Sequence, residues 1–80
     1  MFIEAKKIIG NKVVTQSGQS LGRVVDFEID TSNQSISKYY VHSFLKESLI
    51  INVSQVIEIK KDKIIVEDTL ISAPDVEYAK

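Results

Sequence analysis

Apolar residues along this chain gather in short runs rich in β-branched and aromatic side chains, and clusters of polar turn residues separate the runs. Runs of roughly four to eight such residues are typical of strands, whereas an amphipathic helix repeats its apolar positions every three or four residues. The pattern predicts six strands, at Val13–Val14, Leu21–Asp30, Ile36–Phe44, Leu49–Val53, Val56–Ile59 and Lys63–Glu67.

The connections between several of these strands are short and polar, at residues 16–20, 31–35 and 60–62. Short connections suit antiparallel hairpins, because parallel strands need a crossover of a dozen or more residues. We therefore expect an all-β fold, a small six-stranded antiparallel β-barrel, in which residues 1–71 form one domain. Residues 72–80 are expected to be a C-terminal tail or to form one helical turn that begins near Ser72 and Pro74.

The second predicted strand alternates between apolar and acidic positions. Side chains two residues apart lie on the same face of a strand, so the odd-numbered apolar residues are expected to point into the core. These core candidates are Leu21, Val25, Phe27 and Ile29. The same alternation places Val24 on the outer face, where an apolar side chain could contact a partner.

Glycines accompany the turn before this strand. Gly18 lies in a polar turn where a positive φ is expected, and Gly22 lies inside the strand, where glycine costs stability unless the backbone requires it. The pair predicts a tight turn followed by a bulge or a close backbone approach. Gly10 similarly predicts a turn before Val13.

Several strands have apolar residues at consecutive positions, which leaves some of them outside a single barrel interior. Such outward apolar side chains need cover from a loop, a tail or a second molecule. These outward residues and Val24 form a candidate interaction surface, which favours a homodimer. The outward residues are Tyr40, Phe44, Ile50 and Ile65.

Composition narrows the possible partners. The chain has 44% hydrophobic and 26% charged residues with a formal net charge of −1, and its short lysine clusters do not predict the basic stripe that duplex-binding proteins show. It has no cysteine and no apolar run long enough to span a membrane, and we expect no signal peptide because Glu4 stands where a basic segment would be needed. We expect a cytoplasmic protein with a protein partner, no nucleic-acid partner and no membrane span.

Candidate chemistry is sparse. Asp26, Glu28 and Asp30 share one strand face and could hold a cation or act as acid and base, but the same alternation keeps a half-exposed strand soluble. Asp30 can also accept hydrogen bonds from backbone amides in the following turn. The lone His42 has no nucleophile in a catalytic context, and no phosphate-binding loop is present. We expect no enzymatic activity, no cofactor and no metal site.

The chain resembles the PRC-barrel family, which includes the cytoplasmic domain of the photosynthetic reaction centre H subunit and a domain of a ribosome maturation factor. The resemblance runs from about residue 8 to residue 71 and rests on the segments 9–14, 17–26, 49–56 and 62–66, with the pattern G-x-x-L-G-x-V-x-D at its centre. Residues Gly18, Leu21, Gly22 and Asp26 match that pattern.

The resemblance implies a six-stranded barrel that serves as a protein-interaction or assembly module without shared catalytic residues. It leaves two functions open, because fold alone does not decide between them. One is a self-associating adaptor, and the other is a ribosome- or RNA-processing-associated factor in which Lys60, Lys61 and Lys63 approach phosphate.

Overall fold

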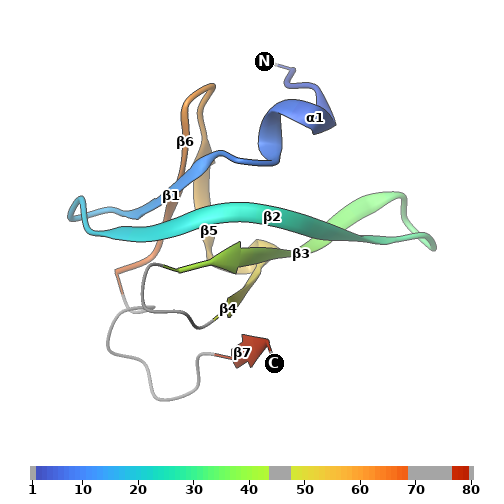
Figure 1. The fold of residues 1–80 in the computed structure, drawn as a ribbon. Coiled ribbons are helices and arrows are strands. Elements are labelled where there is room, and N and C mark those ends of the chain that lie inside the picture. Colours follow the sequence, from blue (N-terminus) through green and yellow to red (C-terminus); the bar gives the residue numbers. More distant parts are fainter. Residues whose placement is uncertain (1, 44–47, 69–76, 80) are drawn as a thin grey trace.

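The computed structural model describes residues 2–43, 48–68 and 77–79, and shows one curved β-sheet preceded by a short helix (Figure 1). The elements follow one another as α1 (Ala5–Ile8), β1 (Lys12–Thr15), β2 (Ser20–Asp30), β3 (Ser35–His42), β4 (Ser48–Asn52), the 3₁₀ turn η1 (Val53–Gln55), β5 (Val56–Ile59), β6 (Lys63–Val66) and β7 (Glu77–Ala79). The all-β prediction is confirmed, and β1 to β6 each begin within one residue of a predicted strand.

The sheet is mixed and open, with the strand order β5-β6-β1-β2-β3-β4-β7. β1 pairs with β6 in parallel, while the other described pairs are antiparallel. The predicted closed, fully antiparallel barrel is therefore wrong. The N-terminal strand β1 lies between β2 and β6, and η1 turns the chain between β4 and β5, so these two consecutive strands do not pair.

The corner at η1 has a local cause in the sequence. The Asn52 side chain accepts from the backbone of Gln55, and the Asn52 N–H donates to Gln55 Oε1 at 2.9 Å. This reciprocal capping stabilises a helical turn at the point where a hairpin would otherwise form.

Two elements were not predicted. α1 precedes the first predicted strand, and β7 pairs antiparallel with β4 within the expected tail. Residues 77–79 are therefore extended rather than helical, and the expected helix start at Ser72 and Pro74 lies outside the described residues.

One hydrophobic cluster forms the core of the described chain, with buried side chains from α1, β1, β2, β3, β4 and β6. Its members are Ile8, Val13, Val24, Tyr39, Val41, Ile51, Ile64 and Val66. Because strands from both halves of the sheet contribute, the sheet curves around a shared interior.

The predicted alternation along β2 is wrong at Val24, Val25 and Ile29. Val24 pairs with Val41 and Asp26 pairs with Tyr40, so Val25 is an extra residue in β2. A bulge of this kind shifts the alternation by one position. Val24 is 1% exposed and belongs to the core, whereas Val25 and Ile29 are each 53% exposed. Among the predicted core residues of β2, Leu21 and Phe27 do pack against the core cluster.

Gly22 occupies the close backbone approach that the sequence predicted. It has φ +137°, and an added Cβ would overlap the carbonyl oxygen of His42 and lie 2.8 Å from His42 C and 2.9 Å from Ser43 Cα. A register shift in the β1–β2 pairing beside it makes Leu21 a second extra residue in β2. The prediction of a bulge with close approach at Gly22 is confirmed.

The turn between β1 and β2 is held from several sides. Gly18 has φ +96°, as predicted for a tight turn, and its N–H donates to the Thr15 carbonyl at 2.9 Å. The buried hydroxyl of Thr15 accepts from the Gln19 N–H at 3.1 Å. The Ser17 N–H donates to Asp68 Oδ1 at 2.9 Å, and this bond lowers the pKa of Asp68. The turn is thereby tied to the chain that leaves β6.

Candidate interaction surface

The outer face of the sheet is the face that points away from the core cluster. Half-buried apolar side chains lie on it in two places. Tyr40 and Ile50 are register partners on β3 and β4, and Val14 and Ile65 are register partners on β1 and β6. β1 and β2 separate β3 from β6 in the strand order, so the sheet does not bring Ile65 next to Tyr40 and Ile50.

The remaining members of the predicted surface differ in outcome. Val24 is part of the core cluster, because the bulge at Val25 reverses its face, and it cannot contact a partner. Phe44 lies outside the described residues. Val25, predicted to be buried, instead adds an exposed apolar side chain on β2 beside Tyr40's register partner Asp26.

Three cations stand side by side across the outer face. Lys63 of β6 pairs in register with Lys12 of β1, and Lys12 pairs with Arg23 of β2. We call Lys63, Lys12 and Arg23 the basic row. Arg23 Nη1 donates to the Gly10 carbonyl at 2.9 Å, while Lys12 and Lys63 form no ion pair with any residue that the structure describes. Like charges directly opposite one another in a sheet repel, so the row is a local cost to the fold.

The sequence did not reveal this row, since its members are separated by 11 and 40 residues along the chain. The parallel pairing of β1 with β6 places Lys63 beside Lys12. Once the strand order is known, the signal is that Lys12 and Lys63 both occupy outward positions on paired strands.

The acidic stripe, Asp26, Glu28 and Asp30, lies on the same outer face farther along β2. Asp26 Oδ1 accepts from the Phe27 N–H at 2.8 Å. Glu28 accepts from the Tyr40 hydroxyl at 2.7 Å, and its other oxygen lies 4.0 Å from Lys38 Nζ. Each of these acids therefore has a structural partner, although all three are solvent-exposed.

Asp30 ends the stripe and caps the β2–β3 turn. Its Oδ1 accepts from the Ser32 hydroxyl at 2.6 Å and from the Ser32 N–H at 3.0 Å. These bonds to the charged form, first the hydroxyl and then the amide, lower the pKa of Asp30. The predicted turn-capping role of Asp30 is confirmed.

His42 has an exposed side chain on β3 and pairs in register with Arg23. Its carbonyl, rather than its imidazole, is the group that approaches Gly22. Within the described ranges, no three His, Asp or Glu side chains gather in a way that could hold a metal ion.

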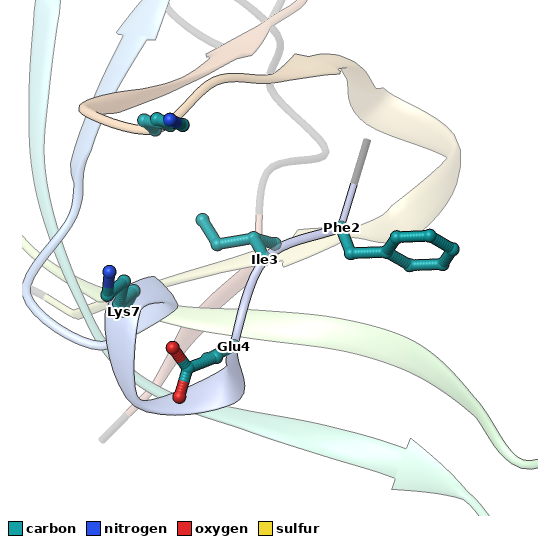
Figure 2. A pocket seen from close by; sticks show the side chains of 5 residues that line it. Phe2, Ile3, Glu4 and Lys7 are labelled. Atoms are coloured by element: carbon teal, nitrogen blue, oxygen red, sulfur yellow. The ribbon is translucent and has the colours of Figure 1, made fainter.

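A small hollow of about 220 Å³ lies beside α1, lined by Phe2, Ile3, Glu4, Lys7 and Lys61 (Figure 2). Ile3 packs against the core cluster, whereas the Phe2 ring is fully exposed and points away from Glu4 and Lys7. Glu4 also forms an exposed ion pair with Lys6 at 3.5 Å. No sequence pattern predicted this hollow, because its residues come from two segments that lie outside the predicted strands.

The sequence of this chain can be compared with the sequence profiles of known protein families. The sequence profile of the PRC-barrel domain matches residues 1–70. The chain belongs to the PRC-barrel domain family. A search of curated proteins gives no match. Membership of this family indicates a small domain with a role in protein interaction or assembly.

In this PRC-barrel domain, Gly18, Leu21 and Gly22, which match the family pattern, have structural roles. Gly18 and Gly22 shape the β1–β2 hairpin, and Leu21 packs against the core. Across the described part of the chain, no helix has the length and apolar character needed to cross a membrane.

Proposed function

We propose that this PRC-barrel domain is a non-enzymatic protein-interaction module that forms a homodimer through the outer face of its sheet. The observation that carries the proposal is the combination, on one face, of the Tyr40–Ile50 pair and the exposed Val25 with two groups of opposite charge. Aromatic and aliphatic side chains surrounded by charged residues are the usual composition of an interface centre and its rim.

The exposed acids support binding rather than catalysis. Glu28 and Asp30 each hold hydrogen bonds that position Tyr40 and the β2–β3 turn. Lowering the pKa of Asp30 keeps its carboxylate charged, which suits a capping group and a rim charge but opposes a general acid.

A second function, association with RNA or a ribosome, is favoured by one observation, the basic row. Lysine and arginine side chains at adjacent register positions could neutralise neighbouring phosphates. The acidic stripe lies on the same face, however, and the whole chain carries a net charge of −1. A polyanion along β2 would meet these carboxylates, so the protein partner is the better-supported proposal.

Sedimentation equilibrium of the purified chain over a wide range of protein concentration, at low and high salt, tests the homodimer. We expect a reversible monomer–dimer equilibrium that weakens with salt and persists at high salt, because the interface combines charged rims with an apolar centre. A monomer at every concentration and at both salt levels would refute self-association.

Fluorescence anisotropy with a labelled single-stranded RNA separates the second function from the first. The adaptor predicts no saturable binding at physiological salt. Binding whose logarithmic affinity falls linearly with the logarithm of salt concentration would favour the RNA-associated function instead.

A further inference from the structure

We propose that the homodimer is formed by two outer faces related by a two-fold axis near Val25, so that the basic row of each copy meets the acidic stripe of the other. This inference rests on the self-association proposed above and adds the surface and the pairing. Its occupant is a second copy of this chain, and the argument is charge complementarity within one face.

Positive and negative charges are separated along β2. Arg23, with Lys12 and Lys63 beside it, lies on one side of Val25, and Asp26, Glu28 and Asp30 lie on the other. A two-fold rotation about an axis that lies in the interface plane and is perpendicular to β2 reverses the direction of β2. With the axis near Val25, the Arg23 end of one copy lies over the Glu28 end of its partner.

The same rotation brings the apolar centres together. Val25 is 53% exposed, and the Tyr40–Ile50 pair lies on β3 and β4, the next two strands of the sheet after β2. An isologous interface uses each patch twice, so Val25, which lies near the axis, is covered by its own counterpart, and Tyr40 and Ile50 face β3 and β4 of the partner. Two salt-dependent contact zones then flank one apolar centre.

The interface also supplies ion-pair partners for the lysines of the basic row. Within one copy, Lys12 has Lys63 on one side and Arg23 on the other, and no described acid forms an ion pair with Lys12 or Lys63. Acids of a second copy supply the missing opposite charge. The row therefore costs the monomer some stability and adds specificity to the dimer.

A charge exchange between Lys12 and Asp26 tests the pairing. The variants are K12E and D26K, measured separately and as an equimolar mixture by sedimentation equilibrium at low salt. Each variant alone places like charges in both contact zones, and we expect its dimer dissociation constant to rise at least tenfold. In the mixed dimer both zones again hold opposite charges, and we expect the affinity of the wild-type protein to return.

Folding and charge controls accompany the exchange. K12E places an acid between Lys63 and Arg23, so the folded monomer should unfold at a urea concentration no lower than that of the wild-type protein. K61E makes the same charge change in the β5–β6 turn, two residues before Lys63 but outside the basic row, and should dimerise like the wild-type protein.

The other outcomes separate the two proposals. A wild-type dimer that K12E and D26K leave unchanged, or a mixture that fails to restore a weakened dimer, overturns the pairing while self-association stands. A wild-type monomer at all concentrations overturns both. RNA binding that K12E abolishes in a monomeric protein would assign the basic row to a polyanion and also overturn the pairing.

Discussion

The backbone of β2 at Gly22 approaches the backbone of His42 and Ser43 so closely that no side chain fits between them. Its φ of +137° is one that residues with a Cβ rarely adopt, and its missing side chain leaves room for the backbone of His42 and Ser43. Two independent requirements, conformation and space, therefore demand glycine at this position. Gly18 meets the first requirement only, since its φ is +96° but an added Cβ would have no atom within 4 Å.

Replacing each glycine with alanine separates these two requirements. Gly22→Ala should lower the free energy of unfolding by more than about 2 kcal/mol, because strain and backbone overlap add. Gly18→Ala should cost about 1 kcal/mol from conformational strain alone. Urea unfolding at low protein concentration measures both. Equal effects of the two substitutions would show that the close approach to β3 contributes nothing.

Single residues were predictable where the local chemistry alone decides their role. A glycine inside a strand and an aspartate before a polar turn each have few explanations, and both Gly22 and Asp30 behave as expected. Val24 was not predictable in this way, because its face depends on an extra residue one position later whose effect appears only in the pairing with β3.

At the scale of elements, β2 bends around the core by means of its two extra residues. Leu21 is unmatched against β1, and Val25 is unmatched against β3. Each bulge shifts the alternation, so inward positions are even-numbered at Gly22 and Val24 and odd-numbered at Phe27. A sequence with apolar residues at both 24 and 25 fits either register until the partner strand is known.

Truncating these neighbouring valines tests the register directly. Val24→Ala removes two buried carbon atoms from the core and should cost about 2 kcal/mol of unfolding free energy. Val25→Ala acts on an exposed bulge residue and should change it by less than about 0.5 kcal/mol. Chemical denaturation at a protein concentration that keeps the chain monomeric gives both values. The reverse ranking would mean that the simple alternation from Leu21 to Ile29 holds after all.

Strand positions were predictable from composition, but their arrangement was not. Runs of β-branched and aromatic residues mark strands whatever their neighbours, so β1 to β6 were found. The parallel β1–β6 pair joins segments 51 residues apart, and η1 depends on reciprocal bonds between Asn52 and Gln55. Neither feature leaves a periodic signal in the sequence. The turn η1 separates β4 from β5, and the parallel β1–β6 pair creates the basic row.

At the scale of the whole molecule, the outer face of the sheet leaves apolar side chains in contact with water. The outer face carries Tyr40, Ile50 and Val25 between opposite charges, and a second copy would remove this surface from water. A small domain without disulfides gains stability by such association, since dimer formation lowers the free energy of the folded state only.

This coupling between association and folding predicts a concentration-dependent melting temperature. If the folded chain dimerises and the unfolded chain does not, raising the protein concentration well above the dissociation constant should raise the melting temperature of the wild-type protein by several degrees. K12E, whose dimer is disfavoured, should melt at a nearly constant temperature over the same concentrations, and K61E should follow the wild-type protein. Calorimetry over a hundredfold range of concentration gives the comparison. A constant melting temperature for the wild-type protein would mean that the domain reaches its full stability alone, and that its outer face is available to a different protein.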